Sequence, residues 1–366
     1  MTARATALVL TEPRRFERRE YDLPAVGDHD GLLRIEACGL CGTDHEQYTG
    51  DIRSAHAFVP GHEVIGVIEQ LGSAASERWG VSEGQRVAVE VFKSCRECDA
   101  CRSGLYRRCE RHGLATMVGF VDADAARGIG GGYATHLHLD PDSMLLPVPA
   151  SLDPVTATLF NPLGAGIRWA VDLPQTAPGE VVVVLGPGVR GLSAAAAAKE
   201  AGAGFVMITG VGPRDAERLS LAERFGADLT VDVNVTDPRR ALRDAVGVQA
   251  DVVVDVTAKA PAALGQAVAL ARPGGTLVLA GVRGSSETPG FEPDHIVYKE
   301  LTIHGALGVD VDAYRRALDM LADSRYPFSE LPRRIAGFDD LEHLVQSMAG
   351  EHADPPPVHG VFSPTV

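Results

Sequence analysis

The stretch EVVVVLGPGVRG at residues 180–191 decides the fold of a large part of the chain. A run of β-branched residues leads directly into a turn with GxGxxG spacing, formed by Gly186, Gly188 and Gly191. In such a turn the first glycine allows a tight bend, the second lets the backbone approach a pyrophosphate, and the third lets the helix pack on the strand. The start of the helix then offers free N–H groups to the anion. The motif therefore predicts a nucleotide-binding turn.

The sequence around this turn alternates short apolar runs with helical patterns. The expected strands are 180–185, 205–209, 229–233, 251–256, 276–280 and 301–307, and the expected helices are 191–201, 216–225, 238–246 and 261–271. Strands that are apolar on both faces and are followed by crossover helices specify a parallel sheet covered on two sides. Six of them predict an α/β fold, a Rossmann-type doubly wound parallel sheet, which we place at 152–307.

The remaining segments have a different pattern. Residues 1–151 contain short strands, such as 31–37, 64–71 and 86–91, between turns rich in glycine, proline and charge, which predicts a mainly β, partly barrel-like domain. The tail, 308–366, has helical patterns at 311–323 and 339–349 and an expected last strand at 358–362. The tail is too short for a core of its own, so we expect it to pack back on the N-terminal domain.

The composition excludes several classes of protein. Lys and Arg total 34 and Asp and Glu total 49, giving a net charge of −15, which disfavours nucleic acid as a partner. There is no signal-peptide pattern and no apolar run of the roughly 18–20 residues that a membrane helix needs. We therefore expect a cytoplasmic protein without a membrane partner. Clustered cysteines in such a chain indicate a metal before disulfides.

The clearest metal motif is Cys95-x2-Cys98-x2-Cys101-x7-Cys109, within a lobe at about 93–111. This spacing suits tetrahedral zinc, and a shell closed by four thiolates leaves no open position for chemistry. Iron–sulfur proteins also use four cysteines, but with other spacings. The motif predicts one structural zinc.

A second set of candidate residues lies closer to the N-terminus. The sequence has CGTD at 41–44 and GHE at 61–63. Neither motif is specific alone, and GHE is no metalloprotease motif because residue 66 is glycine. Cys38 and Cys41 also have CxxC spacing, so a redox pair or half of a second zinc finger stays open.

Taken together, CGTD, GHE, the four-cysteine lobe and GPGVRG make the whole chain resemble the medium-chain zinc alcohol dehydrogenases, especially the polyol, threonine and glucose dehydrogenase branch. The resemblance implies a GroES-like catalytic domain. It also implies that Cys41 and His62 are catalytic zinc ligands and that Glu63 is a ligand or its neighbour. Asp44 would orient His62 through its second ring nitrogen, and Thr43 would relay the alcohol proton.

The cofactor is expected to be NADP or NAD. An acid at the end of the second strand of the sheet would bind the adenosine ribose of NAD, but this chain has Gly210 there, with Arg214 close by. We favour NADP, with Asp215 as the ribose partner in the alternative. The expected cofactor-binding residues are Gly186, Gly188, Val189, Arg190, Gly191, Gly210, Arg214, Gly281 and Val282.

Two positions depart from the family pattern. The branch has a Glu-Pro-Leu stretch that supplies a third protein ligand, whereas this chain has Asn161-Pro162-Leu163. Asn161 stays a candidate ligand, although a neutral amide oxygen binds zinc poorly. Many relatives also carry a relay histidine five residues after the cysteine, where this chain has Glu46, preceded by His45.

We therefore expect an NAD(P)-dependent oxidoreductase that transfers a hydride between an alcohol or polyol and the nicotinamide, with zinc as Lewis acid. The substrate would be a small alcohol or carbonyl compound, and the chain would form a homodimer or homotetramer through the edge strand 301–307. Two alternatives stay open. One is a reductase of the same fold that keeps only structural zinc, and the other is a nucleotide-binding regulator without catalysis.

Overall fold

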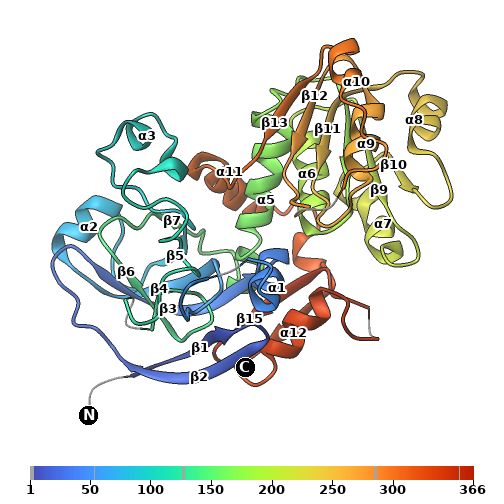
Figure 1. The fold of residues 1–366 in the computed structure, drawn as a ribbon. Coiled ribbons are helices and arrows are strands. Elements are labelled where there is room, and N and C mark those ends of the chain that lie inside the picture. Colours follow the sequence, from blue (N-terminus) through green and yellow to red (C-terminus); the bar gives the residue numbers. More distant parts are fainter. Residues whose placement is uncertain (1–3, 53, 126–127, 284–286, 354) are drawn as a thin grey trace. The chain divides into compact units, whose positions relative to one another are not determined.

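The computed structural model describes all residues except 1–3, 53, 126–127, 284–286 and 354. The chain divides into two compact units, each built on its own β-sheet (Figure 1). The first unit comprises Met1–Phe160, Leu318–Ser324 and Phe328–Val366, and the second comprises Asn161–Ala317 and Arg325–Pro327.

The second unit contains a six-stranded sheet in which every neighbouring pair of strands is parallel. In spatial order the strands are β10 (Leu229–Asp232), β9 (Phe205–Gly210), β8 (Val181–Leu185), β11 (Ala250–Asp255), β12 (Ala271–Leu279) and β13 (Thr302–Gly305). The helices of this unit are α6 (Val189–Glu200), α7 (Ala216–Ala222), α8 (Pro238–Val246), α9 (Ala263–Leu270) and α10 (Asp294–Tyr298). It also contains α5 (Phe160–Ile167) from Asn161 onward and α11 (Val311–Ala322) as far as Ala317. The predicted Rossmann-type doubly wound sheet is confirmed.

The strand order of this sheet determines where a ligand can bind. All five residues of β8 are buried, as expected for a central strand that is covered on both faces. Chain order runs outward from β8 to β10 on one side and resumes at β11 on the other, so the order reverses between β8 and β11. In open α/β sheets the ligand crevice lies beyond the carboxyl ends of the strands at this reversal. The glycine turn at 186–191 follows β8 at this edge.

The first unit contains a mainly antiparallel sheet, which agrees with the predicted β domain. The sheet order is β14 (Arg333–Ala336), β15 (His359–Phe362), β3 (Gly31–Leu40), β4 (Glu63–Leu71), β5 (Arg86–Val89) and β7 (Leu145–Pro147), and β6 (His136–Leu139) pairs with β3. A separate hairpin consists of β1 (Arg4–Glu12) and β2 (Arg15–Asp22). The helices are α1 (Gly42–Thr49), α2 (Ser73–Trp79), α3 (Asp99–Arg102), α4 (Pro154–Ala157) and α12 (Leu341–Met348).

Several elements differ from their predicted extent. The hairpin β1–β2 and the helix α1 are absent from the sequence-based prediction. The strand expected at 301–307 is regular only over Thr302–Gly305, and the last strand begins at His359 rather than at residue 358. The tail supplies β14, β15 and α12 to the first unit, where β15 pairs with β3.

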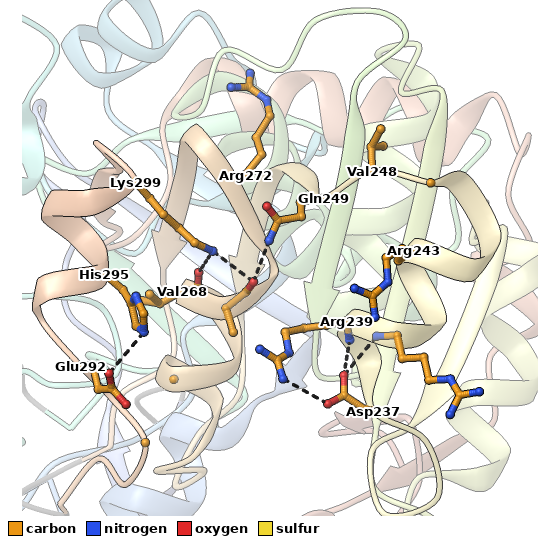
Figure 2. A pocket seen from close by; sticks show the side chains of 15 residues that line it. Asp237, Arg239, Arg243, Val248, Gln249, Val268, Arg272, Glu292, His295 and Lys299 are labelled. Atoms are coloured by element: carbon orange, nitrogen blue, oxygen red, sulfur yellow. Dashed lines mark hydrogen bonds and ion pairs between the residues drawn. The ribbon is translucent and has the colours of Figure 1, made fainter.

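The second unit also carries a hollow between α8, α9 and α10, with a volume of about 1020 Å³ (Figure 2). Its walls include arginines of α8 and residues at the end of α9. None of the helices in the described part of the chain is long and apolar enough to cross a membrane.

Candidate functional site

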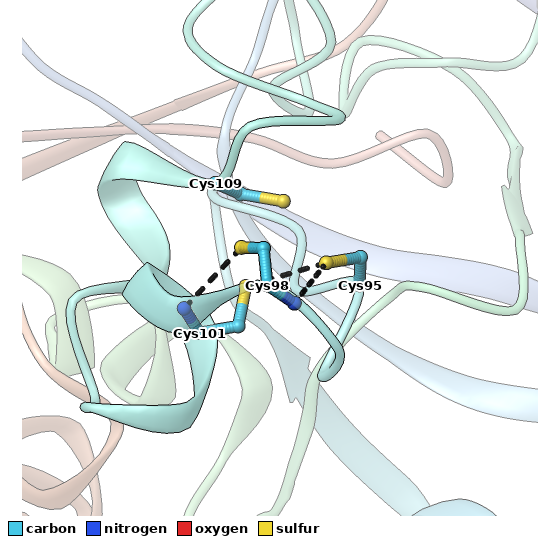
Figure 3. A group of neighbouring side chains, drawn as sticks. All are labelled: Cys95, Cys98, Cys101 and Cys109. Carbon is cyan, nitrogen blue, oxygen red and sulfur yellow. Dashed lines mark hydrogen bonds between the residues drawn. The ribbon is translucent and has the colours of Figure 1, made fainter.

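The first candidate metal site is the group of four cysteines in the lobe of the first unit. The sulfur atoms of Cys95, Cys98, Cys101 and Cys109 all lie within 4.8 Å of one another (Figure 3). Cys95 Sγ and Cys101 Sγ are 3.7 Å apart. Tetrahedral zinc with Zn–S bonds of about 2.3 Å places its sulfurs about 3.8 Å apart, so the group fits zinc.

Backbone N–H groups prepare these sulfurs to carry charge. The N–H of Cys98 points at Cys95 Sγ at 3.4 Å, and the N–H of Cys101 points at Cys98 Sγ at 3.5 Å, where α3 begins. Hydrogen bonds from the backbone of Cys98 and Glu97 lower the pKa of Cys95 to about 6. The thiolate form of Cys95 is therefore favoured at neutral pH, whereas burial raises the pKa of the Cys101 thiol to about 11.

The second candidate metal site brings together Cys41, His62 and Glu63, whose ligand atoms lie within 4.8 Å of one another. All three side chains are buried. Cys41 Sγ is 3.3 Å from His62 Nε2. A sulfur and a nitrogen on one tetrahedral zinc would be about 3.5 Å apart, so the pair has the separation of two ligands of one metal ion.

The carboxylate of Asp44 lies nearest to Nδ1 of the His62 ring, whereas the sulfur of Cys41 lies nearest to Nε2. Asp44 Oδ1 is 3.9 Å from His62 Nδ1, and Asp44 Oδ2 accepts the N–H of Cys41 at 2.8 Å. Among the described residues neither Asp44 Oδ1 nor His62 Nδ1 has a hydrogen-bond partner, although both are buried. A carboxylate on Nδ1 leaves Nε2 free to bind a metal, which is the arrangement that fixes metal-binding histidines.

The local backbone makes room for these side chains. Gly61 has φ of +91°, and a Cβ there would lie 2.8 Å from the ring of Tyr133. Gly39 pairs with Glu63 across β3 and β4, and a Cβ at Gly39 would lie 2.3 Å from Glu63 Oε2. Only glycine at position 39 leaves space for the carboxylate in this place.

These observations test whether zinc fits the second site. The donor set is one sulfur, one nitrogen and one carboxylate oxygen, all of which bind zinc in proteins. Burying the carboxylate of Asp44 beside these ligands is costly unless a positive charge compensates it, and a divalent cation would do so. Three protein ligands also leave a fourth position open, as in catalytic rather than structural zinc sites. The residues present therefore fit zinc.

The neighbouring candidates have distinct surroundings. Cys38 is fully buried, and burial, followed by the charge of Asp44, raises the pKa of its thiol well above the usual value. Cys38 is therefore a neutral thiol, which disfavours the redox-pair interpretation. Thr43 lies in the first turn of α1 and is partly exposed. His45 Nε2 lies 2.6 Å from Glu351 Oε1.

The glycine turn of the second unit has the geometry that its spacing predicts. Gly186 has φ of +104°, and Gly188 has free space around it, where a ligand could approach. A Cβ at Gly191 would lie 1.8 Å from Gly186 O, so the helix α6 can only pack this closely on the strand with glycine there. Val189 and Arg190 form the first turn of α6.

The carboxyl ends of the neighbouring strands meet at the same edge. Thr257 follows β11 and packs within 3.1 Å of a Cβ placed on Gly186, and its carbonyl oxygen lies 1.8 Å from a Cβ placed on Gly281. Val282 is exposed beside Gly281. Three segments, the glycine turn after β8 and the residues that follow β11 and β12, thus lie around the place where a dinucleotide would bind.

Sequence reasoning missed a buried ion pair at this edge. Asp255, the last residue of β11, pairs with Arg283 and accepts the hydroxyl of Thr257 at 2.6 Å. An acid that ends a run of valines is the signal that could have revealed it, because a fully buried carboxylate requires a partner.

The end of β9 shows why no acid occupies position 210. A Cβ on Gly210 would lie 2.8 Å from Pro187 Cγ and 3.2 Å from Asp215 Cβ, so an acidic side chain has no room. Asp215 is buried, and its carboxylate accepts the N–H of Val211 at 2.9 Å and a hydrogen bond from Arg214 at 3.0 Å. Burial raises the pKa of Asp215, but these hydrogen bonds outweigh it and lower the pKa.

Asn161 has its amide engaged inside the second unit. Its Nδ2 donates to the hydroxyl of Tyr314 at 2.9 Å, and its Oδ1 accepts from Arg190 Nη2 at 3.4 Å. The guanidinium of Arg190 also lies over the ring of Trp169, 5.4 Å from its centroid. The oxygen atom through which an asparagine could bind zinc is therefore already in a hydrogen bond.

Comparison with known proteins gives a consistent result. Residues 27–150 match the model of the alcohol dehydrogenase GroES-like domain, and residues 190–323 match that of the zinc-binding dehydrogenases. The chain is 63% identical to "Probable alcohol dehydrogenase adh" of Mycobacterium tuberculosis over 98% of both chains. It is 30% identical to the sorbitol dehydrogenase of Bacillus subtilis, covering 93% of this chain and 88% of that protein.

Solved structures share the fold over the whole chain. A protein of Sinorhizobium meliloti 1021 assigned as a zinc-binding dehydrogenase, solved bound to NADP, has a TM-score of 0.84 at 28% identity, covering 99% of this chain and 100% of that one. An alcohol dehydrogenase of Thermotoga maritima has a TM-score of 0.86 at 22% identity, covering 99% of both. With both metal groups and the nucleotide turn in place, the chain belongs to the medium-chain zinc-binding alcohol dehydrogenase family.

Proposed function

We propose that this chain oxidises a small alcohol or polyol to the corresponding carbonyl compound and also catalyses the reverse reduction of the carbonyl compound. Catalytic zinc would be held by Cys41, His62 and Glu63. The observation that carries the proposal is the gathering of these three ligand atoms within 4.8 Å, with Asp44 placed behind His62. The resemblance to a sorbitol dehydrogenase supports a substrate of the alcohol or polyol class. The zinc-independent reductase is disfavoured because it would have no use for this ligand set.

The reaction divides between the bound groups and the protein. A bound nicotinamide would accept the hydride of the carbinol carbon, and the protein would take the proton of the hydroxyl group, so that a carbonyl is left. Zinc supplies the Lewis acidity that stabilises negative charge on the substrate oxygen. Asp44, whose Oδ1 lies 3.9 Å from His62 Nδ1, would orient the ring of His62, and the partly exposed Thr43 would relay the hydroxyl proton. His45, hydrogen-bonded to Glu351, is the better of the two candidates to pass that proton on.

We infer a preference for NADP over NAD. Gly210 leaves no room for the acid that would bind the ribose hydroxyls, and the carboxylate of Asp215 is turned toward Val211 and Arg214. The side chain of Arg214 is 68% exposed and can bind a 2′-phosphate. The relative from Sinorhizobium meliloti solved bound to NADP supports this choice.

The metal assignment predicts two zinc ions per chain with different properties. We expect His62→Ala to lose one zinc and at least about a hundredfold in alcohol oxidation, because it removes a ligand. Cys98→Ser should instead lower the melting temperature, because it opens the structural site. Elemental analysis, turnover and thermal unfolding measure these effects. His343→Ala, an exposed histidine of α12, is the matched control and should change none of them. Two zinc ions retained in His62→Ala would contradict the assignment.

The contacts of Asn161 predict the result of restoring an acid at this position. In Asn161→Glu the new carboxylate should pair with Arg190, so zinc affinity should stay close to that of the native protein. In the double variant Asn161→Glu, Arg190→Met the carboxylate loses this partner, and zinc should be held about tenfold more tightly or better. Competition with a chelator measures the affinity. A higher zinc affinity in the single variant than in the native protein would show that Arg190 does not form the expected ion pair with the carboxylate at position 161.

The cofactor proposal predicts the effect of removing Arg214. Arg214→Ala should weaken NADP(H) binding by about tenfold to a hundredfold, because hydrogen bonds to a charged phosphate are lost, and it should leave NAD(H) nearly unchanged. Fluorescence titration of the reduced cofactors measures both affinities. Arg315→Ala, an exposed arginine of α11, is the control. A native protein that binds NAD(H) more tightly would be incompatible with the proposal.

We also propose that the chain forms a dimer, or a tetramer of such pairs, through β13. This strand ends the sheet order, and in the described part of the chain no further strand pairs with its outer edge, on which Ile303 is exposed. Val297 and Tyr298, just before the strand, are 72% and 76% exposed. An apolar edge of this kind is suited to pairing across a twofold axis.

The association proposal predicts a multiple of the monomer mass by light scattering at micromolar concentration. The double variant Val297→Asp, Tyr298→Asp should shift the protein toward monomer, because two charges would be buried at the interface. Val235→Asp, at an exposed valine in the connection between β10 and α8, should leave the mass unchanged. A monomeric native protein would refute the proposal.

A further inference from the structure

The charged side chains that line the hollow between α8, α9 and α10 are mainly basic, although the whole chain carries a net charge of −15. Of the residues that line it, four are arginine and one is lysine, against one aspartate and one glutamate, so the difference in charge is 5 − 2 = +3 with histidine neutral. The arginines are Arg239, Arg240, Arg243 and Arg272. Positive charge is thus concentrated at one place in an acidic protein.

Two of these cations face a common space. Arg239 and Arg243 lie four residues apart on α8, so they occupy the same face of the helix. Figure 2 shows their guanidinium groups extending toward the side of the hollow on which Lys299 and His295 lie. Burial lowers the pKa of Lys299, and the charge of Arg239 lowers it further, which agrees with like charges that converge.

The hydrogen bonds and ion pairs of each side chain show which of these cations already have partners within the protein. Lys299 donates to the carbonyl oxygens of Val268, Ala269 and Ala271, where α9 ends, so its role is largely structural. Arg272 pairs with Asp251 at 2.5 Å and Arg240 with Asp244 at 3.5 Å. These two arginines are therefore only partly available to a ligand.

Arg239 and Arg243 are the available groups. Arg239 has a single weak ion pair, at 3.5 Å from Asp237, whose other oxygen caps α8 by accepting the N–H groups of Arg239 and Arg240. In the described part of the chain no carboxylate lies within ion-pair distance of Arg243. The position of Arg239 and Arg240 in the first turn of α8 is also unfavourable for the helix dipole, which disfavours cations there. Helix stability therefore does not explain the arginines.

We propose that this hollow is an anion-binding site, separate from the dinucleotide turn, that takes a small phosphorylated molecule with two or more negative charges. Arg239 and Arg243 would hold the phosphates in their planar forks, because guanidinium groups bind phosphate in a bidentate manner. Lys299 adds a further positive charge on the opposite side of the hollow. The volume of about 1020 Å³ exceeds what a free phosphate needs and suits a phosphate ester of nucleotide size.

The experiment uses inorganic pyrophosphate as the probe and isothermal titration calorimetry as the measurement. The native protein is first saturated with NADPH, so that the dinucleotide site is occupied and cannot take the probe. We expect one pyrophosphate per chain, with affinity that falls steeply as salt is added. In the double variant Arg239→Gln, Arg243→Gln the affinity should fall by about tenfold or more, because two charged hydrogen-bond donors are lost.

The controls separate this site from other sources of binding. Arg315→Gln removes one positive charge from an exposed arginine of the same unit, as the single variant Arg243→Gln does in the hollow, and should leave pyrophosphate affinity unchanged. NADPH affinity should be equal in all three proteins. If the double variant unfolds, the single variant Arg243→Gln serves, because Arg243 has no ion pair to lose within the described residues. No binding to the NADPH-saturated protein, or equal binding by the native protein and the variants, would overturn the proposal.

Discussion

The antiparallel pairing of β3 with β4 is the constraint on which the candidate metal site depends. Gly39 lies opposite Glu63 and Cys38 opposite Val64, so the residue just after β3 and the residue just before β4 emerge at the same end of the pair. Cys41 and His62 are these flanking residues. This explains why their side chains are 3.3 Å apart although the two residues are 21 positions apart in the sequence. A shift of this register by one residue would turn Glu63 to the other face of the sheet.

In the second unit a parallel sheet likewise brings together residues that are far apart in the sequence. Its strands end at one edge, and glycines at 186, 191 and 281 let three separate backbone segments approach closer than any side chain would allow. Backbone segments are therefore closely packed at this edge, whereas a Cβ placed on Gly188 would meet no atom within 4 Å. The alcohol dehydrogenase thus places the residues of its metal site at the end of an antiparallel strand pair and its cofactor turn at the edge of a parallel sheet.

The sequence allows the parallel sheet, the glycine turn and the four-cysteine group to be predicted, because each has a local signal of period or spacing. The group of Cys41, His62 and Glu63 has no such signal and is implied only by the resemblance to the family. Helix α1 has no such signal: its eight residues are mostly polar, and it begins because the Asp44 carboxylate accepts the N–H of Cys41. The contacts of Asn161 with Tyr314 and Arg190 join positions up to 153 residues apart, which no local pattern reveals. The burial of Asp215 and the ion pair of Asp255 with Arg283 are likewise results of tertiary packing.

The central claim is that Cys41, His62 and Glu63 hold a zinc ion distinct from that of the four cysteines. Anomalous diffraction at the zinc absorption edge, from crystals of the purified protein, tests it most directly. The claim predicts two zinc peaks per chain, one enclosed by Cys95, Cys98, Cys101 and Cys109 and the other about 2.3 Å from Cys41 Sγ and at bonding distance from His62 Nε2. A single peak confined to the four cysteines, from protein that is active as purified, would contradict it.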